Sequence, residues 1–474
     1  MGSPYFPART VLFRKEASGV TYRIPALLYL PGSTTFLAFC EERFSPDDAQ
    51  ANLLALRRGV FYRNYVEQWE DMTALESAQL RGYRSMNPCP VYDEFTGTVF
   101  LFFIAVLGHT SESQQLITGK NVTRLCYVSS GDQGRSWSSV TDLTQCTIGD
   151  TIEDWATFAL GPGHGIQLKS GRLLVPAYAY YIHCRECFGK VCLTTPHSFC
   201  FHSDTHGRTW RFGEFVPNLK TVECQMVSVD EESGTNVLYC NARTPLGYRV
   251  QALSFDDGAV FQEGQLVQKL VEPPHGCHGS TVGFPAPFDF QSQTLSATHK
   301  ALTGWQEQAS QTLLRSRSTM LDRNPVALPT SSHCGKKSQL HKGQSAKFLP
   351  PTWVIYSHPT FPSSRLDLGI YLSLFPRDPD SWTEPWVIYE GPSAYSDLAY
   401  LELPSLDSFD SPPGIAFACL FENGTQTPYE EISFSIFTFY DLIRNIPRMT
   451  KQAQRCGGAG SLWTVLRKRW CWTQ

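Results

Sequence analysis

Short runs of apolar residues alternate with turn-forming residues along most of the chain. Representative runs are residues 58–63, 98–107, 172–181, 237–243, 353–359 and 415–421. Each has the length of a strand, is rich in β-branched or aromatic residues, and is bounded by Gly, Pro, Asp or Ser, which is typical of β-strands. Helical periodicity is scarce outside 438-TFYDLIRNI-446. The pattern predicts an all-β fold.

A short motif recurs three times between these runs. Its copies are 130-SGDQGRSW-137, 203-SDTHGRTW-210 and 254-SFDDGAVF-261. They share a Ser, an Asp two residues later, a Gly two residues after that, and an aromatic residue, although the second copy has Thr205 at the Asp position. The Asp side chain can bond to the backbone of a tight turn, Gly supplies a positive φ, and the aromatic ring packs beneath. We interpret the copies as structural turns, spaced like propeller blades with insertions, and not as sites.

Composition divides the chain. Its 474 residues, 42% of them hydrophobic and 13% aromatic, suffice for a sizeable core. Residues 291–343 are polar, rich in Ser and Gln, and without strand periodicity, so we expect a disordered insert there. The expected propeller thus has a first part, residues 1–290, and a last part, residues 344–450. Residues 451–474 are expected to be a flexible basic and aromatic tail.

The tail ends in 466-LRKRWCWTQ-474. Its basic residues can meet anionic headgroups, and its tryptophans suit a membrane interface. We therefore expect peripheral membrane association without a spanning helix. A prenylation box at Cys471, a fragment of a nuclear signal and a solvated, frayed tail are the alternatives.

The net charge of −4 provides no bulk basic surface for nucleic acid. The first sixteen residues lack the apolar segment of a secretory signal, and the longest apolar run, residues 98–108, is about half the length of a membrane helix. We expect an intracellular protein that is cytoplasmic or peripheral to membranes, endomembrane or lysosomal, with the nucleus as an alternative.

The fifteen cysteines are an odd number in a chain with no readable secretory signal, which predicts mostly free, buried thiols. Cys184 and Cys187 have the CxxC spacing, and Cys192 follows closely. A zinc site there would need a fourth ligand such as His183 or His197, and no second CxxC supports it.

The stretch 20-VTYRIPALLYLPG-32 places Arg23 at the entrance of a strand that reads as buried. A buried guanidinium is costly unless an anion pairs with it. From these residues alone, the anion is either a carboxylate of the core, which is the commoner case, or the carboxylate of a ligand.

Several motifs, together with the repeated turns, closely resemble the vertebrate sialidases. They are 22-YRIP-25, 84-RSMNPCP-90, 161-GPGHGIQL-168, 222-VECQ-225, 272-EPPHGC-277 and 395-YSDL-398. The stretches 45-SPDD-48, 186-ECFGK-190 and 382-WTEPWVIYEGPS-393 are most similar to the fourth vertebrate type. The resemblance covers nearly the whole chain apart from the insert and the extreme C-terminus. It implies a six-bladed β-propeller with its site at one end of the central channel.

The resemblance also implies that Arg23, Arg243 and Arg365 clamp the carboxylate of sialic acid. A guanidinium stays charged, and its planar fork matches a carboxylate. Three arginines need acidic neighbours, and Glu431 is the expected partner that orients Arg23, with Glu41 as a second candidate. Taken singly, each arginine could instead form a structural ion pair.

For cleavage, Tyr395 matches the family's nucleophile, Glu223 its base, and Asp48 the acid that protonates the leaving oxygen. A second anion would be repelled from an anomeric carbon that already bears a carboxylate, whereas a neutral phenol would not; sialidases are the tyrosine exception among glycosidases. A phenol with a pKa near 10 needs a partner base. A buried core tyrosine and a plain loop aspartate are the alternatives, and the neighbouring Asp47 could take the acid's place.

The remaining contacts implied for the sugar are Arg43, Met86, Asn87, Glu112, Tyr178 and Tyr180. His278 stands where the family often has Gln. Its side chain could donate a hydrogen bond with a charge that varies near neutrality, or it could be a core or loop histidine.

We therefore expect an exo-α-sialidase that acts on sialylated glycolipids, glycoproteins and oligosaccharides, with no metal or cofactor and no nucleic acid partner. Its roles would lie in ganglioside and oligosaccharide catabolism. A propeller lectin that binds sialic acid without cleaving it would keep the three arginines but not Tyr395, Glu223 and Asp48. A scaffold propeller would not need the arginines.

Overall fold

The computed structural model describes residues 5–62, 65–187, 191–231, 234–287, 350–403 and 414–447. The chain divides into two compact units. The larger comprises Met1–Val229, Asn236–Phe284 and Thr352–Gln452, and the smaller Asp230–Thr235, Pro285–Pro351 and Ala453–Gln474. In the smaller unit the described residues are 230–231, 234–235, 285–287 and 350–351. The predicted insert and the predicted tail lie outside the described residues.

The described residues form five hydrogen-bonded sheets. The first four follow chain order, with β6 paired to β4 and β12 paired to β13. The first and second sheets contain β2 (Thr21–Leu30), β3 (Thr35–Arg43), β4 (Ala51–Tyr62), β5 (Tyr65–Trp69) and β6 (Thr73–Ala74), and β7 (Tyr83–Asp93), β8 (Thr98–Leu107), β9 (Thr123–Ser130) and β10 (Thr141–Asp142), respectively. The third sheet contains β11 (Trp155–Leu160), β12 (Ile166–Gln167), β13 (Leu173–Cys187), β14 (Val191–Ser203) and β15 (Arg211–Phe212). The fourth sheet contains β16 (Cys224–Asp230), β17 (Asn236–Ala242), β18 (Tyr248–Ser254) and β19 (Gln265–Val271).

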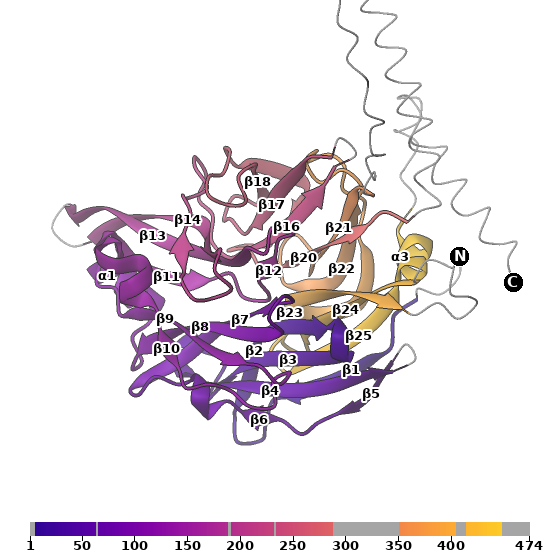
Figure 1. The fold of residues 1–474 in the computed structure, drawn as a ribbon, viewed down its shortest axis with the longest axis horizontal. Helices are drawn as coiled ribbons and strands as arrows, with labels where there is room; N and C mark the ends of the chain where they lie inside the picture. Colours follow the sequence, from indigo (N-terminus) through magenta and orange to yellow (C-terminus); the bar gives the residue numbers. More distant parts are fainter. Residues whose placement is uncertain are drawn as a thin grey trace, which may run out of the picture. The chain divides into compact units, whose positions relative to one another are not determined.

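The fifth sheet joins the two ends of the fold. Its order is β1-β25-β24-β23-β22-β21-β20, so the N-terminal strand pairs with the last one, as Figure 1 shows for β1 and β25. Its strands are β1 (Arg9–Arg14), β20 (Ser280–Pro285), β21 (Thr352–Pro359), β22 (Leu366–Ser373), β23 (Trp386–Leu403), β24 (Gly414–Asn423) and β25 (Glu431–Thr438). β23 pairs with β22 over its first part and with β24 over its second. The described residues form five sheets, so six blades would require that the seven-stranded sheet counts as two blades that share β23. The predicted count of six blades therefore stays a prediction.

The expectation of an all-β fold is confirmed, because helices in the described residues are few and short. The two α-helices are α1 (Glu112–Thr118) and α3 (Phe439–Asn445), of which α3 falls within the one predicted helical segment. Single turns of other helix types lie at Pro31–Ser33, Asp48–Gln50, Glu76–Ala78, Thr144–Ile148 and Gly149–Asp154.

The core lies between neighbouring sheets, which gives a propeller-like arrangement. Phe102 and Ile104 of β8 belong to the same buried cluster as Trp155 of β11 and Phe199 and Phe201 of β14. A second cluster joins Phe36 of β3 with Leu401, Leu420 and Phe434 of the fifth sheet. Each sheet thus buries apolar area against the next, at about 25 cal/mol per Å².

The interpretation of the repeated motif as a structural turn is confirmed. In the first copy Ser130 Oγ accepts a hydrogen bond from Gly134 N–H at 2.8 Å, and Asp132 Oδ1 accepts one from Ser136 N–H at 2.9 Å. In the second copy Thr205 replaces Asp as acceptor, because its Oγ1 binds Thr209 N–H at 2.9 Å. The Gly residues have positive φ in all three copies.

The prediction of mostly free, buried thiols holds for the described cysteines. Ten of them are free, and nine of these ten are buried. Cys184 is disulfide-bonded, which removes its sulfur from the zinc site considered above. Within the described ranges no group of three His, Cys, Asp or Glu residues could hold a metal ion.

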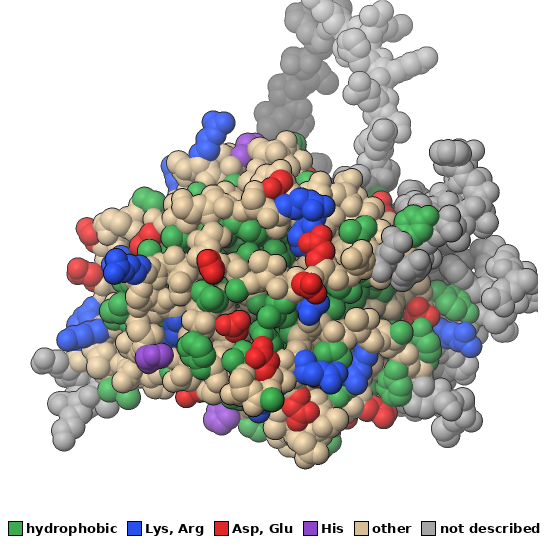
Figure 2. All heavy atoms as spheres, turned by 90° about the horizontal axis from the view of Figure 1, so that it is seen from below, with side chains coloured by type: hydrophobic (Ala, Val, Ile, Leu, Met, Phe, Trp, Pro, Cys, Tyr) green, Lys and Arg blue, Asp and Glu red, His purple; other side chains and the backbone are tan. Residues whose placement is uncertain are grey.

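Charges of both signs are interspersed on the face of the molecule seen in Figure 2. Among the helices of the described residues, none is long and apolar enough to cross a bilayer.

Candidate active site

A cavity of about 770 Å³ collects most of the predicted site residues, which come from strands of four sheets and from loops, including those beside β16 and β17. Its wall includes Arg23, Arg43, Asp48, Met86, Asn87, Glu112, Tyr178, Tyr180, Glu223, Arg243, Arg365 and Tyr395. These residues are up to 372 positions apart in the sequence, so only the closed arrangement of sheets brings them together. His278, Glu41 and Glu431 are not in the wall.

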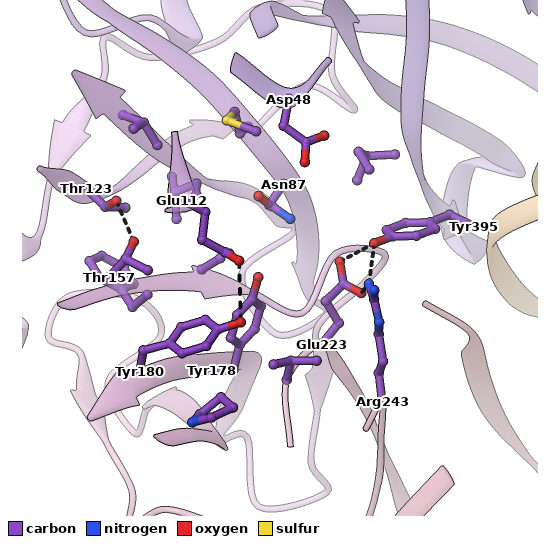
Figure 3. A pocket seen from close by; sticks show the side chains of 18 of the residues that line it. Asp48, Asn87, Glu112, Thr123, Thr157, Tyr178, Tyr180, Glu223, Arg243 and Tyr395 are labelled. Atoms are coloured by element: carbon purple, nitrogen blue, oxygen red, sulfur yellow. Dashed lines mark hydrogen bonds and ion pairs between the residues drawn. The ribbon is translucent and has the colours of Figure 1, made fainter. Parts of the chain in front are cut away.

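Tyr395 and Glu223 form the centre of one side of the cavity (Figure 3). Tyr395 Oη donates a hydrogen bond to Glu223 Oε1 at 2.6 Å. Arg243 Nη1 donates to both residues, to Tyr395 Oη at 2.8 Å and to Glu223 Oε2 at 2.6 Å. The phenol therefore faces a carboxylate that can take its proton, beside a fixed positive charge.

The surroundings of Tyr395 and Glu223 shift their pKa values in opposite directions. Burial and the negative charge of Glu223 raise the pKa of Tyr395 well above its usual value, so its phenol is neutral. Burial opposes the ionisation of Glu223, but the charge of Arg243 and the hydrogen bonds from Arg243 and Tyr395 together outweigh it and lower the pKa of Glu223. In the free protein, a neutral phenol is thus hydrogen-bonded to an ionised base.

The partner of Arg23 differs from the prediction. Arg23 Nε donates to Glu422 Oε1 at 2.6 Å, and no ion pair joins it to Glu431 or Glu41 in the described structure. Glu431 instead pairs with Arg9 and Arg14 at 3.4 and 3.0 Å. Glu422 reaches Arg23 because its strand, β24, lies beside β23 in the fifth sheet, whereas Glu431 begins β25 opposite β1.

Arg365 is held without an acidic partner. Its Nη1 donates to Tyr429 Oη at 3.2 Å and its Nη2 to Gly276 O at 3.0 Å, and no ion pair involves it among the described residues. The guanidinium of Arg23 lies 3.9 Å from the centre of the Tyr429 ring. Tyr429 thus contacts two of the three arginines, and Arg365 keeps an unbalanced charge that an anionic ligand can neutralise.

The predicted acid belongs to a chain of charges on the first sheet. Arg43 donates to Glu41 Oε2 at 2.7 Å from Nε and 2.6 Å from Nη2, and it also binds Asp48. The Asp48 side chain is 74% exposed, and the desolvation that it does experience opposes its ionisation, but the charges of Arg43 and Arg23 outweigh this effect and lower the pKa of Asp48. Glu41 therefore orients Arg43 and not Arg23. The alternative acid, Asp47, caps its own turn by accepting from Ala49 N–H at 2.9 Å.

Two wall residues have positive φ, which is rare for Ile and more readily adopted by Asn. Ile24 has φ 60° and Asn87 has φ 55°, and both stand at register shifts just before a proline. Such conformations cost about 1–3 kcal/mol each and require support from their surroundings. Glu422 accepts Ile24 N–H at 2.9 Å, and Glu41 accepts Asn87 N–H at 2.6 Å. Glu422 thus accepts hydrogen bonds from both Arg23 and Ile24, and Glu41 accepts them from both Arg43 and Asn87.

The opposite side of the cavity carries Glu112, Tyr178 and Tyr180 (Figure 3). Glu112 begins α1, and its Oε1 accepts a hydrogen bond from Tyr180 Oη at 3.4 Å. Although Glu112 is exposed to solvent at its surface, desolvation within the cavity and the negative charges of Glu223 and Asp48 raise the pKa of its carboxyl group to about 7. This carboxyl group therefore changes charge near neutrality.

The structure contradicts the prediction that His278 contacts the sugar. His278 is 0% exposed, lies outside the cavity wall, and packs its ring 5.4 Å from that of Tyr395. Burial lowers the pKa of His278 to about 4, so its charge does not vary near neutrality either. The side chain supports Tyr395 from behind.

Sequence reasoning missed several residues of the cavity and its support. Glu422 gave a signal, because it is a lone carboxylate at the end of the apolar run 415-IAFACLF-421 and therefore needs a buried cation. Arg84, Gln115, Thr123, Thr157 and Tyr429 also line the cavity. Apart from Arg84, which begins the motif 84-RSMNPCP-90, they carry no local pattern that marks them as site residues.

Comparison with known proteins shows which chains and folds this protein is similar to. The model of the BNR repeat-like domain matches residues 35–406. The chain is 49% identical to Sialidase-4 of Mus musculus over 94% of this chain and 96% of that one. It is 44% identical to Sialidase-3 of Homo sapiens over 92% and 93%, respectively. The solved structure of the Hadza microbial sialidase Hz136 matches with a TM-score of 0.62 at 20% identity, over 92% of this chain and 69% of that one, which shows the fold alone.

The fold, the cavity and these relatives together define a glycoside hydrolase. More particularly, the chain belongs to the vertebrate sialidase family, and it is more similar to Sialidase-4 than to Sialidase-3.

Proposed function

We propose that this protein is an exo-α-sialidase that removes terminal sialic acid with net retention, through a sialyl-tyrosine intermediate. The observation that carries the proposal is the hydrogen bond of 2.6 Å between Tyr395 and Glu223, in a cavity lined by Arg23, Arg243 and Arg365. A neutral phenol with a base beside it is the nucleophile suited to an anomeric carbon that bears a carboxylate.

In the first step, the three guanidinium groups hold the sugar's carboxylate, which leaves the anomeric carbon beside Tyr395. The phenol oxygen forms a bond to that carbon as the glycosidic bond breaks. Glu223 takes the phenol proton, and protonated Asp48 gives its proton to the leaving oxygen.

In the second step, water attacks the anomeric carbon and the bond to Tyr395 breaks. Asp48, now a carboxylate, takes a proton from the water, and Glu223 returns its proton to the tyrosine oxygen. Two successive displacements at one carbon give net retention.

The substrate itself prepares Asp48 as the acid. In the free protein, the charges of Arg43, Arg23 and Arg365 lower the pKa of Asp48 against the effect of desolvation. A substrate carboxylate bound by Arg23 and Arg365 adds one negative charge, which offsets part of the positive potential of these guanidinium groups. The pKa of Asp48 therefore rises when the substrate binds, which favours the protonated form that the first step needs.

The substrates proposed are gangliosides, sialylated glycoproteins and oligosaccharides, since a clamp for one carboxylate recognises the terminal sugar and not its carrier. The lectin alternative is disfavoured by the same site, because binding alone would not need a base hydrogen-bonded to a phenol.

The test is hydrolysis of a fluorogenic sialoside by the full-length chain. Wild-type protein should release the fluorophore, and Tyr395→Phe should lose nearly all of this activity while it still binds a sialic acid analogue. A chain that binds the analogue but never hydrolyses the sialoside would favour the lectin.

For location, we propose peripheral membrane association through the tail, in an intracellular setting, because basic residues and tryptophans are combined there. Removal of residues 462–474 should abolish co-sedimentation with anionic vesicles at low salt and leave hydrolysis of a soluble sialoside intact. Unchanged sedimentation after truncation would exclude the tail as the anchor.

A further inference from the structure

One part of the cavity wall, here called the floor, combines buried polar side chains with apolar neighbours. Gln115 and Thr157 line this part and are only 2% and 4% exposed. The apolar neighbours come from one sheet: Met86 of β7 lies opposite Ile104 of β8, and Val106 of β8 lies opposite Thr123 of β9. Buried polar groups in a partly apolar cavity wall indicate a site for a polar atom of the ligand.

The hydrogen bonds of this floor fix which atoms are donors. Gln115 Oε1 accepts from Val122 N–H at 2.9 Å and from Thr123 Oγ1 at 3.1 Å. Because the hydroxyl proton of Thr123 is thereby used, Thr123 accepts in its contact of 3.2 Å with Thr157 Oγ1. Thr157 is therefore the donor in that pair, which Figure 3 shows as a dashed line.

Two hydrogen-bonding functions remain unused. Gln115 Nε2 has no partner among the described residues, and its orientation is set because Oε1 faces a backbone N–H. Thr157 Oγ1 still has acceptor capacity after its proton is donated. Both side chains contact Thr123 Oγ1, so a free donor and a free acceptor lie near one another. A hydroxyl group satisfies both, whereas a methyl group satisfies neither.

The position of the floor indicates which part of the sugar would reach it, if the sugar binds as in the proposed function. C5 of sialic acid is opposite C2 in the ring, so its N-acyl group points away from the arginines that hold the C2 carboxylate. Thr123 and Thr157 lie across the cavity from Tyr395 and Arg243 in Figure 3. The apolar wall of Met86, Ile104 and Val106 suits the acyl carbons, and the polar side around Glu112 and Tyr180 suits the glycerol chain.

We propose that Gln115 and Thr157 are specificity-determining residues of this enzyme, which select an N-acyl group that ends in a hydroxyl over an isosteric one that ends in a methyl. The inference rests on the proposed function for the orientation of the sugar. The N-glycolyl and N-propanoyl groups are the matched pair, because they differ only by OH in place of CH₃. The N-propanoyl methyl would leave Gln115 Nε2 buried without a partner, and a site built for a hydroxyl rejects its apolar analogue.

The experiment compares kcat/KM for 4-methylumbelliferyl α-sialosides with N-acetyl, N-glycolyl and N-propanoyl groups. The full-length protein should prefer N-glycolyl over N-propanoyl by about ten-fold. Thr157→Val, which is isosteric, should reduce this ratio to about one, and Thr157→Ser, which keeps the hydroxyl, should preserve it. Thr118→Val is the matched control, because Thr118 lies outside the cavity wall and bonds to Gln114 O at 2.7 Å.

The outcomes are separable from those of the proposed function. If none of the three sialosides is hydrolysed, the proposed function fails. If the N-acetyl sialoside is hydrolysed but the other two react equally, or N-propanoyl reacts faster, the specificity inference is overturned and the proposed function stands. An unchanged ratio in Thr157→Val would overturn it as well. If that variant does not fold, Gln115→Met is measured instead, with the same expected loss of the ratio.

Discussion

Exchange of Glu422 for glutamine tests whether one buried carboxylate supports the whole catalytic side of the cavity. Glu422 is 0% exposed and accepts from Arg23 Nε at 2.6 Å, Ile24 N–H at 2.9 Å and Tyr395 N–H at 3.1 Å. Glutamine has the same shape but no charge, and its amide nitrogen would place a donor against one of these donors. Removal of one partner from a buried ion pair costs about 3–5 kcal/mol of the free energy of unfolding.

Glu431→Gln provides a matched control in the same sheet. Glu431 is the partner that sequence reasoning assigned to Arg23, but its side chain is 19% exposed and its ion pairs are with Arg9 and Arg14 near the surface. Pairs of this kind contribute about 0.2–1 kcal/mol. Glu431→Gln should therefore change the free energy of unfolding little and leave KM unchanged.

The assay is chemical denaturation of both variants together with KM and kcat for a sialoside. Glu422→Gln should unfold at lower denaturant concentration and show at least a ten-fold rise in KM, because Arg23 is no longer fixed, with kcat also reduced through Tyr395. If Glu431→Gln raised KM more than Glu422→Gln, or if the two variants were equally stable, the assignment of Glu422 as the support of Arg23 would be refuted.

Three further variants test the remaining roles. Asp48→Asn should cripple hydrolysis of natural sialosides, whose alcohol leaving groups are poor, and harm aryl sialosides much less; equal losses in kcat for both substrates would show that Asp48 does not act as the acid. In the wild type, KM should rise above pH 7, because the pKa of Glu112 is about 7 and its ionisation adds negative charge beside an anionic substrate. Glu112→Gln should remove this rise, and a wild-type KM that stays flat through pH 7 would contradict the prediction. His278→Gln should make the free energy of unfolding less sensitive to acid. The pKa of His278 is about 4 in the folded protein and about 6.5 in the unfolded one, so between these pH values only the unfolded state binds a proton at this residue. The stability of the wild type is then complete above pH 6.5 and falls toward pH 4 by up to about 1.4 kcal/mol per pH unit, which Tm at pH 7 and pH 5 should show for the wild type and less for the variant.

The strands of this fold were predictable because their signal is local. The runs that contain 98-TVFLFFIAVL-107 and 353-WVIYSHP-359 are β8 and β21, and the Ser-x-Asp-x-Gly turns follow from side-chain hydrogen bonding within a few residues. Even α1 has a local signal that was overlooked, because Ser111 and Gln114 form a capping box.

The partners of the site residues were less predictable because they depend on strand register. Arg23 and Glu422 are 399 positions apart, and which glutamate of the last strands faces Arg23 depends on how β2 lies beside β23 and β24. The positive φ of Ile24 likewise does not follow from residue preference, because a β-branched residue rarely adopts it, and the surrounding carboxylate supports it. The resemblance to a known family supplied the roles of Tyr395, Glu223 and Asp48, which no periodicity in the chain encodes.

The central claim, that Tyr395 attacks the sugar, is tested most directly by trapping the covalent intermediate. The full-length protein is incubated with 2,3-difluorosialic acid, which slows the second step, then digested and analysed by mass spectrometry. We predict one sialyl adduct per chain, on the peptide that contains Tyr395, formed more slowly in Glu223→Gln because the phenol loses its base. An adduct on Asp48 or Glu223, or inactivation without any adduct on Tyr395, would contradict the account.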